Sequence, residues 1–333
     1  MDHSIALPVL IGLIALALAF DFLNGLHDAA NAIATVVSTR LLSPVTAVVF
    51  AATGNFAAYW IVGLHVAETV GKGIIDKDAV TPAVVFGALV GAMVWNVLTW
   101  IKGIPSSSSH ALIGGLLGAG VAHAGVGVVE SSGTIKTVAA IFVSPVIGFG
   151  IAMALMLFTS WFFRGTSPRG ANSAFKGLHL ISSAAYSISH GGNDAQKTMG
   201  IIAVLLYSTG HLGGEFHVPE WVVLSCYAAI AAGTLSGGWK IIKTMGTKLT
   251  KLNHHTGFCA STAGSIVVFG ASAMGIPIST THAITGSVVG TGAARRASAV
   301  RWSVASRVIV AWFITIPASA AVGAAFYLLT RLF

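Results

Sequence analysis

The sequence predicts an all-α polytopic membrane protein built from two inverted-topology repeats, with interrupted or re-entrant helices and about 10–12 membrane segments. Three observations lead to this fold class. Hydrophobic residues make up 55% of the 333 positions and charged residues only 8%, whereas a soluble domain carries roughly 25% charged residues. Long apolar stretches recur along the whole chain, and two polar motifs each occur twice in the same order.

The apolar stretches are long enough to cross a bilayer, which takes roughly 20 helical residues. The first is expected to be a retained span, because its leader "MDHS" carries an acid where a signal peptide has a positive charge. We therefore expect a multi-pass protein of the plasma (inner) membrane, surrounded by the lipid bilayer. The main stretches are 5–20, 45–70, 82–101, 138–163, 221–242 and 303–329.

The basic charge balance does not indicate nucleic-acid binding. The net charge is +8, but the Lys and Arg residues cluster in short loops beside apolar stretches, as the positive-inside rule predicts. Cys226 and Cys259 lie in apolar segments without metal-ligand spacing, so neither a disulfide nor a structural zinc site is expected. No cofactor is predicted.

One repeated motif carries an acid. "NGLHDAANAIAT" at 24–35 resembles "HGGNDAQKTMGI" at 190–201, which places Asp28 opposite Asp194 at a separation of 166 residues. His27 stands where the second copy has Asn193.

The other repeated motif carries hydroxyls and a histidine. "GIPSSSSHALIGG" at 103–115 resembles "GIPISTTHAITGS" at 275–287, which places His110 opposite His282 at a separation of 172 residues. Since both pairs of motifs share one order and nearly one separation, the chain is predicted to contain two copies of one unit. We expect a first membrane repeat at 1–163, a cytoplasmic linker at 164–173 and a second membrane repeat at 174–333.

The charge of matched loops reverses between the two halves. The linker at 164–173 and the loops at 240–251 and 295–307 are basic, so they are expected on the cytoplasmic side. Their first-half counterparts balance Lys against Asp and Glu and are expected outside. An inverted repeat, which is a secondary-transporter architecture, predicts this reversal and places both termini outside.

Each "GIP" is expected to end one helix and to let another start at its proline, Pro105 or Pro277, because proline disfavours helix in the residue before it. The first turn of the new helix then has backbone N–H groups without partners, the positive end of the helix dipole and several hydroxyl donors. We predict that the two turns face one oxyanion near the midplane; polar packing between helices is the alternative. The predicted anion-binding residues are Ser106, Ser107, Ser108, Ser109, His110, Ser279, Thr280, Thr281 and His282.

Asp28 and Asp194 need a positive partner, because an ionised carboxylate at membrane depth costs at least ~2.5–3.5 kcal/mol. Nearby Asn24, Asn31 and Asn193 offer amide oxygens, and "NG" and "HGG" are expected to break the helix and to free carbonyl groups. These oxygens suit a hard monovalent cation such as Na⁺ on Asp28 and Asp194, unless the acids bind protons. Gln196 is predicted to contact the substrate, and Lys197 either pairs with an acid or contacts the substrate as well.

At these residues the chain resembles the inorganic phosphate transporter (Pit) family. "DFLNGLHDAANAIATVVSTR" at 21–40 and "SHGGNDAQKTMGII" at 189–202 are similar to its duplicated signature, and the two P-x-S-x-x-H segments are similar to its second duplicated element. The resemblance covers nearly the whole chain and implies a symporter for inorganic phosphate, coupled to H⁺ or Na⁺ and often a homodimer. It assigns Asp28, Asn31, Asn193 and Asp194 to the cation and the Ser/Thr runs to phosphate.

Three other functions stay open at this point. A sulfate permease of the same fold would bind its anion with the same Ser and Thr hydroxyls. A passive anion channel would leave the paired acids without a role. An intramembrane hydrolase with a Ser–His pair is disfavoured, because the sequence has neither GxSxG nor HExxH. We therefore do not expect an enzyme.

Overall fold

The computed structural model describes residues 6–332, and no strand lies among them, which confirms the all-helical prediction. Residues 1–5, which include the "MDHS" leader, and Phe333 lie outside the described residues. The first half contains α1 (Leu7–Ser38), α2 (Pro44–Ala57), α3 (His65–Lys72), α4 (Pro82–Lys102), α5 (Ser108–Ala124) and α6 (Ser131–Phe162). The second half contains α7 (Pro168–Ser208), α8 (Glu220–Ser236), α9 (Trp239–Lys243), α10 (His254–Ala273), α11 (Thr280–Arg295) and α12 (Trp302–Leu329).

Several of these helices can cross a membrane. In the described part of the chain, 5 helices, α1, α4, α6, α10 and α12, are long and apolar enough to span, and 7 spans result if each bent pair counts as one. The bent pairs are the interrupted helices: α2 and α3 meet at 84°, and α8 meets α9 with its π-helical extension 244–248 at 64°. The protein is therefore a multi-pass membrane protein.

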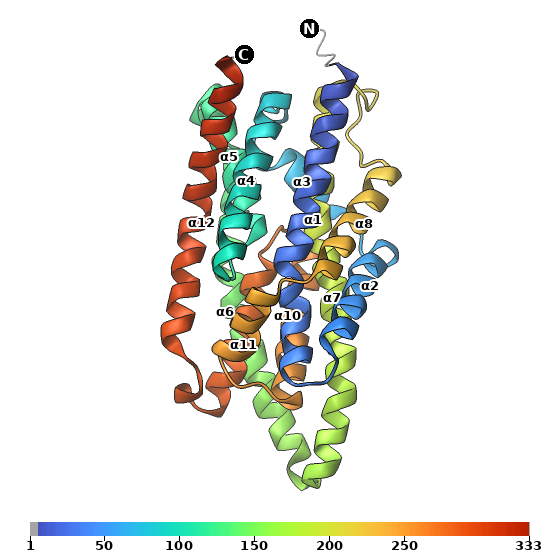
Figure 1. Cartoon of the computed structure of the whole chain (residues 1–333), viewed down its shortest axis with the longest axis vertical. Helices are drawn as coiled ribbons and strands as arrows, with labels where there is room; N and C mark the ends of the chain where they lie inside the picture. The colour runs from blue at the N-terminus through green and yellow to red at the C-terminus, as the bar shows by residue number, and fades with distance from the viewer. Residues whose placement is uncertain (1–5, 333) are drawn as a thin grey trace.

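The two halves run in opposite directions. In Figure 1, α1 descends from the end at which the described chain begins, whereas its counterpart α7 ascends from the opposite end. In the same way α6 descends and α12 ascends, so that the end of α12 lies at the same end of the molecule as the start of α1, and the α6–α7 connection lies at the other. This arrangement is the inverted repeat that the reversed loop charges predict.

Two helical hairpins enter the molecule from opposite ends and turn back at its middle. α4 and α5 form one hairpin and α10 and α11 form the other (Figure 1). The turns begin at Gly103 (φ 63°) and Gly275 (φ 66°), whose left-handed backbone ends each incoming helix. The tips touch, because the rings of His110 and His282 pack edge to face with centroids 4.3 Å apart.

The outgoing helices start later than the prolines predict. α5 begins at Ser108 rather than at Pro105, because the Ser107 side chain accepts a hydrogen bond from the His110 backbone N–H at 3.2 Å and thereby caps the helix. α11 begins in the same way after Ser279. Each proline thus lies in the non-helical turn before the cap.

The predicted breaks at "NG" and "HGG" are wrong, because α1 and α7 are continuous α-helices through both. The glycines instead allow close packing between helices. A Cβ on Gly25 would lie 2.1 Å from the carbonyl oxygen of Ile230 on α8, and one on Gly191 would lie 2.5 Å from the Cα of Asn55 on α2. No backbone carbonyls are therefore freed at these points.

Two buried apolar clusters lie on either side of the acidic motifs. On α1, Leu10, Leu13 and Phe20 belong to one cluster, and Ile33 and Val36 belong to the other. The polar residues between the clusters are thus sealed from both ends by apolar side chains. α7 begins at Pro168, inside the predicted linker 164–173, so only a short turn separates it from α6.

Candidate functional site

The two repeated acids meet at the centre of the molecule. Asp28 on α1 and Asp194 on α7 are 2% and 0% exposed. One carboxylate oxygen from each and one ring nitrogen of His190 all lie within 4.8 Å of one another. The two acids predicted to share a site therefore do so, and they form it together with a histidine.

The first residue of each outgoing helix donates to the acid of its own repeat. The Ser108 hydroxyl lies 3.1 Å from Oδ2 of Asp28 and 2.6 Å from Oδ1 of Asn24. At the matching position of the second repeat, the Thr280 hydroxyl donates to Oδ2 of Asp194 at 3.0 Å. The two helix starts therefore contact the two carboxylates in equivalent ways.

The second residue of each outgoing helix contacts the opposite repeat. Asn31 on α1 donates from Nδ2 to the Thr281 hydroxyl at 2.9 Å, and Thr281 donates to Oδ1 of Asp28 at 3.3 Å. Lys197 on α7 donates to the Ser109 hydroxyl at 2.5 Å. Because these contacts cross between the repeats, neither half completes the site alone.

The charges of the site do not balance. Lys197 pairs with Oδ1 of Asp194 at 2.5 Å and also donates to the carbonyl of Ile278 at 2.8 Å. Asp28 has no lysine; its Oδ1 lies 2.9 Å from Nδ1 of His27, whose Nε2 is 3.1 Å from the hydroxyl of Thr99. With neutral histidines, two carboxylates face one ammonium group, and one negative charge needs a further cation.

His190 is the site residue that the sequence analysis missed. Its Nδ1 lies 3.1 Å from Oδ1 of Asn55, whose Nδ2 in turn donates to Thr234. In the neutral ring, Nδ1 therefore carries the proton, and the lone pair of Nε2 faces Oδ2 of Asp194 at 3.3 Å. A cation between these two atoms would stabilise the arrangement. Its position in the repeat could have identified His190 as a site residue, since it matches Asn24 in the first repeat.

Several predicted residues serve the framework around the acids. Gln196 lies outside the cluster: its Oε1 accepts from the N–H of Val66 at 2.9 Å and its Nε2 donates to the carbonyl of Gly63 at 2.7 Å. It therefore holds the start of α3. The Ser106 hydroxyl donates to Thr99 at 2.9 Å, while Ser107 and Ser279 cap their helices.

Two buried amide oxygens on the helices that carry the acids have no hydrogen-bond partner. Asn193 donates from Nδ2 to the hydroxyl of Ser272 at 2.9 Å, while its buried Oδ1 has no hydrogen-bond partner. Oδ1 of Asn31 is buried without a partner in the same way. Buried acceptors without donors are costly, so these oxygens are suited to binding a cation.

The paired histidines lie at the hairpin tips without touching a serine hydroxyl. Both ring nitrogens of His110 and Nε2 of His282 are buried without a partner. The ring of His282 stacks on Trp312 with centroids 3.7 Å apart, and its Nδ1 lies 3.5 Å from the carbonyl of Ile141. A hydrolase needs a nucleophile hydrogen-bonded to its base, and neither motif contains such a pair.

The chain is similar to known proteins over nearly its full length. The model of the phosphate transporter family matches residues 24–323. A probable low-affinity inorganic phosphate transporter of Rhizobium meliloti (strain 1021) is 59% identical over 327 residues, which cover 98% of each chain. One of Bacillus subtilis (strain 168) is 41% identical over 100% of both chains. A solved structure titled "The sodium-dependent phosphate transporter" matches with a TM-score of 0.87 and 26% identity, and the match covers 98% of this chain and 100% of that one.

Proposed function

The chain belongs to the phosphate transporter family, and on this premise we propose that it moves inorganic phosphate through the plasma membrane by symport with H⁺ or Na⁺. One observation carries the proposal: two helix starts, one from each inverted repeat, bring hydroxyl donors onto two buried carboxylates, of which only Asp194 is paired with an ammonium group. Donors for an oxyanion and acceptors for a cation thus lie in direct contact.

The contacts suggest how the two ions are coupled. Without a cation, the hydroxyls of Ser108 and Thr280 donate hydrogen bonds to Asp28 and Asp194. A cation bound between the carboxylates and His190 takes over these oxygens, and the hydroxyls are then free to donate to an anion. Binding of the anion therefore requires the cation, and by linkage the anion raises the affinity for the cation to the same degree.

The residues divide into two sets in this proposal. The cation is held by Asp28 and Asp194 with the free amide oxygens of Asn31 and Asn193. Phosphate is held by the hydroxyls that contact these groups and by the backbone N–H groups of the first helical turns. The phosphate set is Ser108, Ser109, Thr280 and Thr281.

The orientation in the membrane is part of the proposal. We place the basic connections near 164–169, 248–251 and 295–301 in the cytoplasm, and they gather toward the end of the molecule opposite Leu7 and Leu332 (Figure 1). Both termini are then outside, and the repeats 1–163 and 174–333 cross the membrane in opposite senses on either side of 164–173. We further propose that the protein forms a homodimer.

Uptake of radiolabelled phosphate into proteoliposomes tests the function. An imposed pH or Na⁺ gradient is expected to drive accumulation of phosphate above its external concentration, and the gradient that succeeds identifies the coupling ion. Arsenate is expected to compete, and sulfate is not. Uptake that only equilibrates, whatever the cation gradient, would indicate a channel, whereas equal competition by sulfate would indicate a permease for tetrahedral oxyanions in general.

A further inference from the structure

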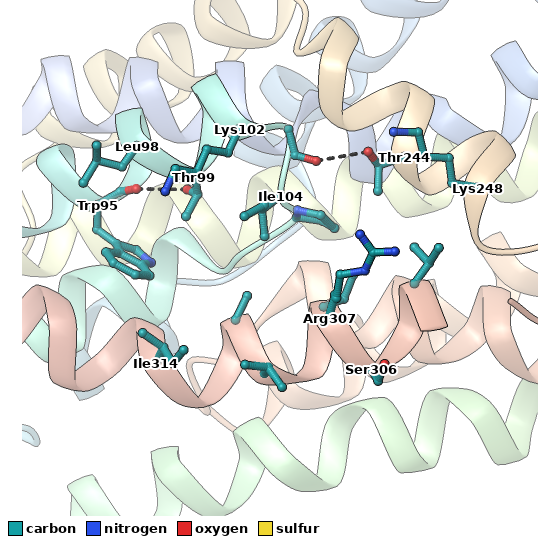
Figure 2. Close-up of a pocket in the computed structure, with 16 residues that line it drawn as sticks. Trp95, Leu98, Thr99, Lys102, Ile104, Thr244, Lys248, Ser306, Arg307 and Ile314 are labelled. Atoms are coloured by element: carbon teal, nitrogen blue, oxygen red, sulfur yellow. Dashed lines mark hydrogen bonds between the residues drawn. The ribbon is translucent and has the colours of Figure 1, made fainter. Parts of the chain in front are cut away.

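A basic groove lies beside the first hairpin and next to the central site, because Thr99, which contacts His27, also lines the groove. It is a cavity of about 710 Å³ between the end of α4, the π-helical segment 244–248 and α12. The turn Gly103–Pro105 lies at its inner side. Figure 2 shows Arg307 reaching from α12 toward Ile104, with Lys102 and Lys248 on the opposite side of the groove.

The three cations of the groove have no acid beside them. Lys102, Lys248 and Arg307 are exposed, and no Asp or Glu lines the cavity. Among residues 6–332, none of the three lies within 4.0 Å of a carboxylate oxygen. Three positive side chains that line one cavity without a counter-ion favour an anionic ligand.

One side of the groove is apolar and faces outward. Leu98 on α4 and Val310 and Ile314 on α12 line it, and they are 45%, 55% and 47% exposed on the surface of a membrane protein. A path for hydrated phosphate would need polar walls, because desolvating the ion on aliphatic side chains is costly. An acyl chain, by contrast, fits against such a surface.

The opposite end of the molecule contains the matched groove, which has a different charge. It is a cavity of about 420 Å³ between α3, the turn that includes Gly275–Pro277, and the start of α6. Its charged residues balance: Glu68, Lys72, Glu130 and Lys136. Since the inverted repeat builds both grooves from equivalent segments, the framework alone does not require the unpaired cations of the first.

We propose that the basic groove binds an anionic phospholipid, with the phosphate headgroup on Lys102, Lys248 and Arg307 and an acyl chain along Leu98, Val310 and Ile314. Basic pockets between transmembrane helices are suited to such headgroups, and each basic residue near an anionic lipid surface contributes about 1 kcal/mol.

Native mass spectrometry of the purified full-length protein tests the proposal. Wild type is titrated with phosphatidylglycerol or, separately, with phosphatidylcholine, and the bound lipid per protomer is counted. We expect phosphatidylglycerol to bind preferentially, and its apparent affinity to fall about five-fold for each cation removed in Lys102→Gln, Lys248→Gln and Arg307→Gln and further in the triple variant. The matched control is Lys72→Gln with Lys136→Gln, which leaves the basic groove intact and is expected to bind as wild type does.

Thermal unfolding of each variant separates loss of binding from loss of fold, and Arg307→Gln alone serves as the test if the triple variant does not fold. Unchanged phosphatidylglycerol binding in a folded variant, or an equal loss in the control, would overturn the proposal. Displacement of the lipid by millimolar inorganic phosphate would assign the groove to free phosphate instead. Covalent cross-links between protomers through a cysteine at Val310 would assign it to an interface between copies.

Discussion

Lys197 occupies on α7 the position that Asn31 occupies on α1, and each donates to the second residue of the other repeat's outgoing helix, Lys197 at 2.5 Å and Asn31 at 2.9 Å. The two contacts are equivalent in position, but the donor is a cation in one repeat and a neutral amide in the other. Lys197 also neutralises Asp194, whereas Asp28 has no such partner. The pseudo-symmetric site is therefore electrostatically asymmetric, and Asp28 is the acid with the greater need for a cation.

Replacing either acid is expected to remove cation coupling. We expect Asp28→Asn and Asp194→Asn each to abolish concentrative phosphate uptake in proteoliposomes while the protein remains folded and inserted, because an amide neither binds a proton nor carries a charge for Na⁺. Asp76→Asn, at an exposed acid outside the cluster, is the control and should accumulate phosphate as wild type does. Accumulation at the original rate and gradient by Asp28→Asn would exclude that carboxylate as the coupling group.

The first hydroxyl of each outgoing helix is expected to contribute to phosphate affinity. A hydrogen bond to a charged group contributes about 1.5–3 kcal/mol, so Ser108→Ala and Thr280→Ala should each raise the half-saturating phosphate concentration about ten-fold or more. Ser107→Ala is the comparison, because Ser107 caps α5; it should cost about 0.5–2 kcal/mol of stability with a smaller effect on affinity. Binding and melting are measured on the same purified variants. Unaltered phosphate affinity in both Ser108→Ala and Thr280→Ala would mean that these hydroxyls serve only in packing between helices and do not bind phosphate.

Lys197→Asn leaves Asp194 as a buried charge without its ammonium partner. We expect a loss of about 3–5 kcal/mol in stability, because removing one member of a buried ion pair exposes the desolvation penalty of the other. The double variant Asp194→Asn with Lys197→Asn should recover much of this loss, and a double-mutant cycle of unfolding free energies measures the coupling. Additive effects of the two single changes would show that the pair contributes no mutual stabilisation.

Gly25 is expected to tolerate no side chain. Gly25→Ala places a methyl group 2.1 Å from the Ile230 carbonyl oxygen, so α1 and α8 must separate, at a cost of about 1–3 kcal/mol. Gly12→Ala on the same helix is the control, because a Cβ there meets no atom within 4 Å and alanine favours helix by about 1 kcal/mol. Thermal unfolding compares the two, and equal melting temperatures would contradict the close packing.

Accessibility of introduced cysteines tests the orientation. Single cysteines at Lys248 and Arg296 should react only with reagents that reach the cytoplasm, and those at Asp76 and Glu215 only with reagents applied outside. The native Cys226 and Cys259 are buried, which keeps the background low. Labelling of the matched positions 76 and 248 from the same side would contradict the inverted topology.

Much of the fold and of the candidate site could be predicted because two motifs recur at nearly the same separation along the chain. The acids and the hydroxyl runs stood out because polar residues are costly in an apolar chain and each recurs in the other half, and the structure brings both sets together. The interrupted helices were expected, but the interruptions lie in α2–α3 and α8–α9 rather than in α1 and α7. The helix breaks predicted at Gly25 and Gly191 were wrong because glycine occurs both at helix breaks and at close contacts between helices. Only the neighbouring helix, which the sequence does not reveal, distinguishes the two cases.

The roles of Gln196 and His190 depended on tertiary contacts that the sequence does not contain. The side-chain amide of Gln196 could bind an ion. In the structure its oxygen and nitrogen are instead both hydrogen-bonded to backbone groups at the bend after α2. His190 has no counterpart histidine in the first repeat, where Asn24 stands, so duplication did not single it out. The start of α5 was misplaced because a serine cap two residues beyond "GIP" determines where the helix begins.

The contacts that cross between the repeats bear on the origin of the chain. Asn31 reaches Thr281 and Lys197 reaches Ser109, so a single repeat contains donors whose acceptors belong to a second, upside-down copy. A gene encoding only one unit could have built this site only by inserting its product in both orientations and pairing the two forms. Joining two copies in one chain fixes one orientation for each half and lets the two copies differ, as they do at Asn31 and Lys197.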